Sequence, residues 1–254
     1  MQEHLREFNP PPRILMGPGP SNVHPRVLQA MAAPILGHLD PDFLGIMDDV
    51  KEMLRGVFQT ANDLTIPVSG TGTAGMEAAL CNIIEPGDEV VVGINGYFGD
   101  RMADIASRNG ANVSIVSVPW GQPLDPSAVD AELKKHRKVK VLAFVHAETS
   151  TGILSPLKEL AQLGHLYNTI LVVDAVTSLG GVPVATDAWG IDICYSATQK
   201  CLGAPPGLAP ITFGPRAEKA LMERKTKVQS WYLDLSLLKS YWNSNRAYHH
   251  TAPI

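Results

Sequence analysis

The sequence has few cysteines and no excess of positive charge. Its three cysteines, Cys81, Cys194 and Cys201, show no paired spacing, so we expect neither a disulfide framework nor a zinc site. Cys81 and Cys194 are predicted to be small buried residues. A formal net charge of −4 disfavours nucleic acid and anionic membranes as main partners, because both favour clustered Lys and Arg.

A long apolar segment is also missing from the start of the chain. Residues 1–12 are polar and then rich in proline, which disfavours a signal peptide and a membrane-spanning helix. We therefore expect a cytoplasmic protein. With 254 residues, 45% of them hydrophobic, the chain is long enough for one large domain.

Strand-like and helix-like segments alternate from residue 64 onward. Several of the strand-like runs are continuous in Val, Ile and Leu, which is typical of strands buried on both faces. The runs are residues 64–68, 89–94, 112–118, 139–146, 169–174, 191–196 and 208–213. Helices are expected over residues 74–84, 99–109, 126–137 and 156–167, with Asp125 and Ser155 as N-caps. This order predicts an α/β fold with a mostly parallel, seven-stranded sheet flanked by helices.

The segment ahead of the sheet divides into two parts. Residues 41–60 have the apolar spacing of an amphipathic helix, whereas residues 16–21 read Met-Gly-Pro-Gly-Pro-Ser and suit neither a helix nor an inner strand. These residues are either an arm fixed by prolines or a backbone that lines a ligand site, with Gly19 close to the substrate. We assign residues 1–22 to an N-terminal arm and residues 23–254 to a large domain.

The first motif with chemical meaning is Ser-Gly-Thr-Gly-Thr-Ala-Gly at residues 69–75, between a strand and a helix. Unpaired N–H groups at a helix N-terminus bind phosphate well, and Thr71 and Thr73 add hydroxyl donors. A tight turn is the alternative. The motif also fits the dinucleotide pattern G-x-G-x-x-G, with Asp88 and Glu89 at the distance of a ribose partner. Its glycines are Gly70, Gly72 and Gly75.

Two further residues narrow the choice of ligand. Asp174 ends the apolar run 171–173 and should point into the crevice at the carboxyl edge of the sheet, where a buried anion needs a cationic partner. Lys200 follows the strand 191–196 in rigid, apolar company, so its amine is suited to act as a nucleophile or Schiff-base partner. A reactive lysine, a carboxylate and a phosphate site together match pyridoxal 5′-phosphate, whereas a nicotinamide enzyme has no need of the lysine.

These residues resemble the class V aminotransferase family among the fold-type I pyridoxal phosphate enzymes, and within it the alanine–glyoxylate and serine–pyruvate branch. The most specific segments are Glu148-Thr149-Ser150-Thr151-Gly152, Val173-Asp174-Ala175-Val176, Thr198-Gln199-Lys200 and Pro205-Pro206-Gly207. The resemblance implies that Lys200 and Asp174 are catalytic, with Lys200 bound to the cofactor and Asp174 beside its ring nitrogen. The other implied cofactor residues are Thr71, Gly72, Thr73, Phe98, Thr149, Val176, Gln199, Tyr248 and Thr251.

The resemblance also assigns roles to several of these residues. Phe98 stands where many relatives have a Trp that stacks on the cofactor ring, and Val176 would pack against the other face. Tyr248 and Thr251 would reach the cofactor phosphate of a neighbouring subunit, which implies a homodimer with shared sites. Between them, His249-His250 is interpreted as structural rather than as a metal site.

The implied activity is transfer of an amino group from a small amino acid, alanine or serine, to a 2-oxo acid such as glyoxylate. An (S)-ureidoglycine–glyoxylate aminotransferase is an alternative within the family. A nicotinamide-dependent oxidoreductase and an inactive fragment that only dimerises are alternatives outside it. In the family the chain continues into a small C-terminal domain whose arginine binds the substrate carboxylate. That domain and its arginine have no counterpart in this sequence, so we expect the sequence to be truncated before the small domain.

Overall fold

The computed structural model of the chain describes residues 8–243 and residue 246, and within them it contains a seven-stranded sheet. The strand order is β1-β9-β8-β7-β4-β2-β3. The α/β class and the mostly parallel sheet are therefore confirmed. The strands are β1 (Leu64–Ser69), β2 (Glu89–Ile94), β3 (Asn112–Ser117), β4 (Val141–Val145), β7 (Ile170–Asp174), β8 (Ile193–Tyr195) and β9 (Leu208–Phe213).

One strand of the sheet runs against the others. β9 pairs antiparallel with both β1 and β8, whereas β8, β7, β4, β2 and β3 pair parallel with one another. The carboxyl ends of the parallel strands therefore meet at one edge of the sheet, together with the amino end of β9. In open α/β sheets that edge is where ligands bind.

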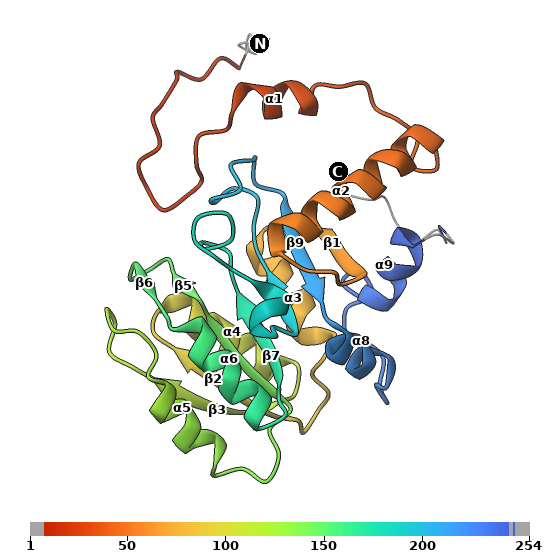
Figure 1. The fold of residues 1–254 in the computed structure, drawn as a ribbon. Coiled ribbons are helices and arrows are strands. Elements are labelled where there is room, and N and C mark those ends of the chain that lie inside the picture. Colours follow the sequence, from red (N-terminus) through yellow and green to blue (C-terminus); the bar gives the residue numbers. More distant parts are fainter. Residues whose placement is uncertain (1–7, 244–245, 247–254) are drawn as a thin grey trace, which may run out of the picture.

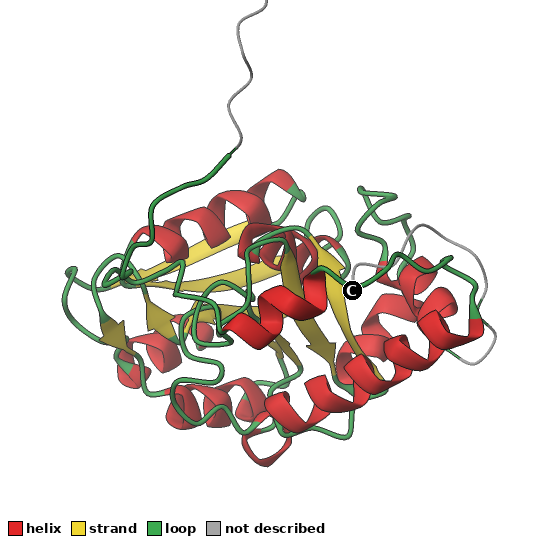
Figure 2. Cartoon of the chain, turned by 90° about the horizontal axis from the view of Figure 1, so that it is seen from above, coloured by secondary structure: helices red, strands yellow, loops and turns green. Residues whose placement is uncertain are grey.

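Helices cover both faces of the sheet, as Figure 2 shows from above. Alternate residues of a strand point to opposite faces, so Val90 and Val92 of β2 belong to one apolar core and Val91 belongs to the other. The first core also takes buried residues from α3 (Gly72–Cys81), α4 (Tyr97–Arg108), α8 (Pro215–Met222) and α9 (Leu235–Trp242). The second takes them from α5 (Pro126–Leu133) and α6 (Leu157–Leu166).

The predicted helices exist, but their ends differ from the sequence expectation. Asp125 caps α5 by accepting a hydrogen bond from Ser127 N–H at 2.8 Å, as predicted. The prediction for Ser155 is wrong, because α6 has Pro156 at its N-cap position and Ser155 is a buried partner of Asn95, at 3.1 Å. The Ser155 hydroxyl could have capped α6, but Ser155 is buried beside Asn95 and bonds to that side chain instead.

Several short elements were not predicted. They are α1 (Pro25–Met31), the hairpin of β5 (Ala147–Glu148) with β6 (Ile153–Leu154), α7 (Thr186–Trp189), α8 and α9. Each is too short to show a periodic apolar pattern. Figure 1 shows α1 and the chain on either side of it as an arch above the rest of the domain.

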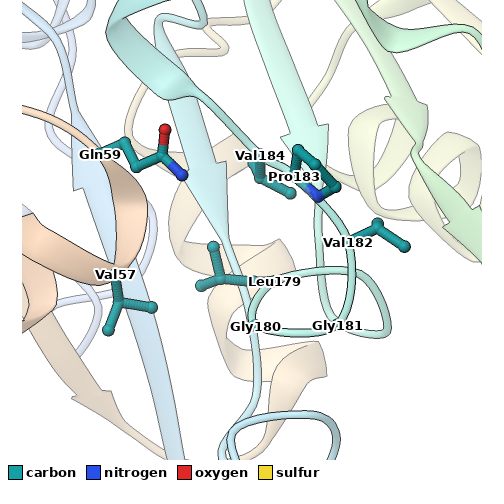
Figure 3. A pocket seen from close by; sticks show the side chains of 8 residues that line it. All are labelled: Val57, Gln59, Leu179, Gly180, Gly181, Val182, Pro183 and Val184. Atoms are coloured by element: carbon teal, nitrogen blue, oxygen red, sulfur yellow. The ribbon is translucent and has the colours of Figure 1, made fainter.

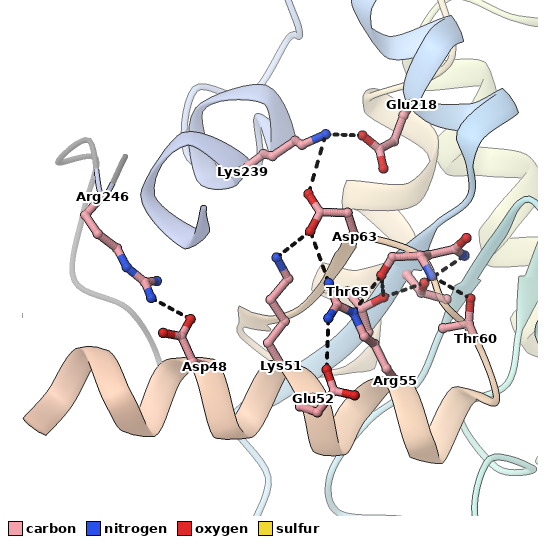
Figure 4. A network of polar contacts seen from close by, with 12 residues as sticks. Asp48, Lys51, Glu52, Arg55, Thr60, Asp63, Thr65, Glu218, Lys239 and Arg246 are labelled. Atoms are coloured by element: carbon pink, nitrogen blue, oxygen red, sulfur yellow. Dashed lines mark hydrogen bonds and ion pairs between the residues drawn. The ribbon is translucent and has the colours of Figure 1, made fainter. Parts of the chain in front are cut away.

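The long helix α2 (Pro41–Phe58) is joined to the sheet by the network of ionic contacts in Figure 4. Asp63, just before β1, accepts hydrogen bonds from Lys51 at 2.8 Å and Arg55 at 3.1 Å. The bond from Lys51 holds the pKa of Asp63 below its usual value. Lys239 of α9 lies 4.0 Å from Asp63 and also pairs with Glu218 of α8. One carboxylate thus joins α2, the start of β1 and α9.

The described part of the arm, residues 8–22, has no helix or strand, and the division into residues 1–22 and 23–254 stays a prediction. None of the helices in the described residues has the length and apolar character needed to cross a bilayer.

Candidate active site

A cavity of about 280 Å³ lies at the carboxyl edge of the sheet. Strand ends, the start of α3 and the first turn of α4 surround it. Every predicted cofactor residue that the structure describes lines this cavity: Thr71, Gly72, Thr73, Phe98, Thr149, Asp174, Val176, Gln199 and Lys200. Residues far apart in the sequence are therefore brought to one place.

Asp174 is a buried carboxylate in the wall of the cavity, only 3% exposed. It accepts hydrogen bonds from Val176 N–H at 2.8 Å and from the Tyr195 hydroxyl at 2.9 Å. Burial raises its pKa to about 6, although those two bonds oppose the shift. Among the described residues no Lys or Arg forms an ion pair with it. A cationic group in the cavity would therefore be stabilised beside this carboxylate.

The N-terminus of α3 offers hydrogen-bond donors to the same cavity. Thr71 is the N-cap residue but makes no capping bond through its side chain. A Cβ on Gly72 would lie 2.9 Å from Val176 Cγ2, so only glycine leaves the backbone this close to the cavity wall. The side-chain Oε1 of Gln199 is buried without a hydrogen-bond partner. The N–H groups at the start of α3 fit an anion such as a phosphate, whereas Gln199 Oε1 is an acceptor and needs a donor.

Lys200 is held by the N-terminal arm. Its Nζ donates a hydrogen bond to the carbonyl of Pro18 at 3.0 Å. Ser21 donates through its backbone N–H to Gln199 O at 2.9 Å and through its hydroxyl to Lys200 O at 3.0 Å. Gly19 has φ +120°, and a Cβ there would lie 2.4 Å from Lys200 Cδ. The arm therefore forms part of the site, and Gly19 lies beside Lys200.

Phe98 and Thr149 reach the cavity from different segments joined by a buried acid. Glu148, 1% exposed, accepts hydrogen bonds from the backbone N–H of Phe98 at 3.1 Å and of Gly99 at 3.3 Å. Thr149 forms a side-chain hydrogen bond with Thr177, at 2.5 Å. The backbone of Phe98 is thus held by a buried side chain from another segment, while its ring packs against the first apolar core.

Sequence reasoning missed some of the lining residues, namely Met76, Arg101 and Val145. Of these, only Arg101 carries charge. Its Nη1 donates to Thr73 Oγ1 at 2.8 Å, and its guanidinium carbon lies 4.9 Å from the centre of the Phe98 ring. Its position three residues after Phe98 on a helix was the signal that could have revealed it.

Two predicted residues, Tyr248 and Thr251, lie outside the described residues, as do His249 and His250. In the described part of the chain no group of three or more His, Cys, Asp or Glu side chains is arranged to hold a metal ion. Both buried cysteines were correctly predicted, since Cys81 and Cys194 are buried and Cys201 is exposed.

The dinucleotide interpretation of residues 70–75 does not agree with the fold. Asp88 and Glu89 lie at the amino end of β2, opposite the cavity edge of the sheet. There the Asp88 carboxylate accepts a hydrogen bond from Lys140 at 2.6 Å, and Glu89 accepts one from Asn112 at 2.9 Å. No acid from this pair is placed to bind a ribose next to α3.

A second hollow, of about 310 Å³, lies between the end of α2 and the loop after β7 (Figure 3). Its lining is apolar or glycine apart from Gln59. This hollow offers no acid, base or nucleophile to a ligand.

An open, mostly parallel sheet with a polar cavity at the carboxyl ends of its strands defines an α/β ligand-binding domain. The chain belongs to the class V aminotransferase family, whose model, described as "Aminotransferase class-V", matches residues 14–241. The chain is 46% identical over 245 residues to the alanine–glyoxylate aminotransferase of Drosophila melanogaster, covering 95% of this chain and 62% of that protein. It is 42% identical over 264 residues to the (S)-ureidoglycine–glyoxylate transaminase of Bacillus subtilis, covering 97% of this chain and 63% of that protein.

Solved structures agree. The crystal structure of an alanine–glyoxylate aminotransferase from Nostoc sp. matches with a TM-score of 0.95 and 54% identity, over 98% of this chain and 66% of that one. A ureidoglycine–glyoxylate aminotransferase from Bacillus subtilis matches with a TM-score of 0.94 and 45% identity, over 97% of this chain and 63% of that one. The chain spans about three fifths of the length of the curated relatives it matches.

Proposed function

We propose that this chain binds pyridoxal 5′-phosphate and forms the cofactor domain of a transaminase. The observation that supports this most strongly is that Lys200, the buried carboxylate of Asp174 and the N-terminus of α3 open onto one cavity. When bound, the cofactor would supply an aldehyde carbon that reacts with amines and a ring that withdraws electrons.

Different residues of the cavity would bind the phosphate, the ring nitrogen and the ring faces of the cofactor. Backbone N–H groups and hydroxyls at residues 71–73 would donate to the phosphate. Asp174 would accept from the protonated ring nitrogen, and this cation would bring its raised pKa back down. Phe98 and Val176 supply an aromatic and an aliphatic surface for the ring faces.

Lys200 is the group that moves the proton. Its Nζ would bind the aldehyde carbon that the cofactor supplies, and as a free amine it would take or return a proton at the substrate's α-carbon. The carbonyl of Pro18 accepts a hydrogen bond from this Nζ, so the arm orients the amine at the cavity. A residue without an amine at position 200 could neither bind the cofactor nor move the proton.

For the substrates we propose a small amino acid, alanine or serine, as donor and glyoxylate as acceptor. The support is the name of relatives such as the Drosophila melanogaster enzyme, an alanine–glyoxylate aminotransferase. The Bacillus subtilis relative, an (S)-ureidoglycine–glyoxylate transaminase, keeps ureidoglycine as an alternative donor. Rates with alanine, serine and ureidoglycine at fixed glyoxylate would separate the two.

Borohydride trapping tests the cofactor proposal directly. The chain is incubated with pyridoxal 5′-phosphate, reduced, digested and analysed by mass spectrometry, with Lys200→Ala as the matched control. We expect one dominant label, on Lys200, that the control lacks. A label spread over surface lysines and equal in both proteins would contradict the proposal.

We further propose that the chain forms a homodimer through its arm. Three apolar residues of the arm are almost fully exposed: Phe8 at 90%, Ile14 at 84% and Met16 at 88%. Large apolar side chains exposed along one short segment favour a contact with another protein surface. Sedimentation should give a dimer, and the double change Ile14→Glu with Met16→Glu should give a monomer. Ile115→Glu, at an exposed position on edge strand β3, is the control that should stay dimeric.

A further inference from the structure

Arg101 is the cation of the cavity that the proposed chemistry has not used. It lies on α4, lines the cavity beside Thr73 and Phe98, and forms no ion pair with any acid among the residues that the structure describes. A guanidinium carries five N–H donors and a permanent charge. Burial raises the pKa of Asp174 across the cavity and the charge of Arg101 opposes that rise, but the two side chains form no ion pair. An arginine that faces a cavity without an ion-paired carboxylate points to an anionic ligand.

The direction of its hydrogen bond adds a second argument. Arg101 Nη1 and Thr73 Oγ1 are 2.8 Å apart. Arginine has no acceptor, so the hydroxyl must be the acceptor in this pair. The single hydroxyl proton of Thr73 is then available for another partner, and Thr73 is in the first turn of α3, where an anion is favoured.

Arg101 also contacts the aromatic side of the cavity. Its guanidinium carbon lies 4.9 Å from the centre of the Phe98 ring and 5.1 Å from that of Tyr97, within the range of cation–π contacts. One side chain therefore connects the hydroxyl on α3 with the ring on α4. Replacing Arg101 would affect the cavity beside Thr73, where a phosphate would lie, differently from the cavity beside the Phe98 ring.

We propose that Arg101 is a positioning residue for the phosphate end of the cavity: it directs the Thr73 hydroxyl proton toward the phosphate and adds positive charge there. The proposal rests on the function proposed above, because it assumes a cofactor with a phosphate. It differs from a structural role in one respect. A structural role would affect ligands with and without a phosphate equally.

Equilibrium dialysis of the full chain against pyridoxal 5′-phosphate and against pyridoxal, which lacks the phosphate, tests the proposal. Arg101→Met should weaken binding of the phosphorylated ligand roughly tenfold or more, and that of pyridoxal by less than about twofold. Arg108→Met is the matched control, since Arg108 is on the same helix, pairs with Asp104 at 2.8 Å and does not line the cavity. It should change neither affinity.

Variants of Thr73 separate the hydroxyl from the charge. Thr73→Val should also weaken only the phosphorylated ligand, Thr73→Ser should restore most of the affinity, and the double variant Arg101→Met/Thr73→Val should bind about as well as the weaker single variant. Equal losses for both ligands, or fully additive effects in the double variant, would overturn the role of Arg101. If the unaltered chain bound neither ligand, the proposed function itself would fail.

Discussion

Glu148 accepts a hydrogen bond from the backbone N–H of Phe98 at 3.1 Å, although the two residues are 50 positions apart in the sequence. The same oxygen, Oε2, accepts from Gly99 N–H, while Oε1 accepts from the backbone N–H and the hydroxyl of Ser150. The carboxylate therefore caps α4 from another segment, where the helix dipole favours a negative charge. It fixes the aromatic residue of the cavity by its main chain.

Replacing Glu148 with Gln tests this contact. An amide has only one acceptor oxygen, so its NH₂ group would face backbone N–H donors in a buried site. We expect the free energy of unfolding to fall by about 2 kcal/mol in urea titrations. Glu159→Gln, an exposed acid in the first turn of α6, is the control and should change it by less than about 0.5 kcal/mol. Similar losses in both variants would count against a special role for Glu148.

The buried Asp174 predicts an unusual pH dependence for the chain without cofactor. Its pKa in the folded chain is about 6, raised from 3.8, so the folded state favours the protonated carboxyl. The benefit is complete below pH 4 and is lost as the pH rises through about 6. Asp174→Asn should therefore be more stable than the unaltered chain at pH 7.5, by up to about 3 kcal/mol, and this difference should shrink toward pH 4.5.

Asp192 provides the comparison. It is also buried, but Arg216 lies 3.1 Å from its carboxylate and Leu171 N–H donates to it at 2.9 Å. Burial raises the pKa of Asp192 as well, but Leu171 N–H and Arg216 oppose that shift, so Asp192→Asn should gain less stability at pH 7.5 than Asp174→Asn does. Urea titrations of both variants at the two pH values measure the contrast. An Asp174→Asn variant with the same destabilisation at every pH would refute the argument from burial.

The position of Gly19 predicts that a side chain there would displace Lys200. A Cβ at this position would fall 2.4 Å from Lys200 Cδ, and the backbone has φ +120°, so Gly19→Ala should displace either the arm or the lysine. We expect the rate of borohydride-trapped labelling of Lys200 to fall by roughly tenfold or more. Gly17→Ala is the control, because a Cβ there would have nothing within 4 Å. Equal rates for the two variants would show that the arm does not orient Lys200.

The burial of the cysteines predicts how fast each thiol reacts with an added reagent. Cys201 is exposed, whereas Cys81 and Cys194 are buried, and burial raises the pKa of both buried thiols. A thiol reagent added to the native chain should therefore label Cys201 rapidly and the other two only after unfolding. Peptide mapping at short times gives the result. Rapid labelling of Cys194 would mean that the central strand β8 opens readily.

The strands of the sheet could be predicted because their side chains are apolar on both faces, as in Val141–Val145. The direction of β9 could not, since a strand carries no local mark of whether its neighbour runs with or against it. Ser155 was wrongly predicted to cap α6 for a similar reason. Its hydroxyl suits a helix cap, but Asn95 offers a buried partner that only the folded chain brings near.

The site could be predicted from the sequence wherever a polar residue ends a buried strand, as Asp174 ends β7. In a parallel sheet those ends meet at one edge whatever the order of the strands. Arg101 escaped prediction because its place depends on how α4 lies against α3. The contact of Lys200 with Pro18 was equally hidden, since nothing local links an arm to a loop so far along the chain.

The Lys200 bond to Pro18 has a consequence for how the protein is made. Its partners are 182 positions apart, so a ribosome has synthesised the arm long before the amine that it binds. Closing a loop of this length has an entropic cost before the contact forms. A nascent or prematurely released chain that ends before residue 200 would carry the arm without the lysine, and the amine would gain this orientation only after the later strands are made.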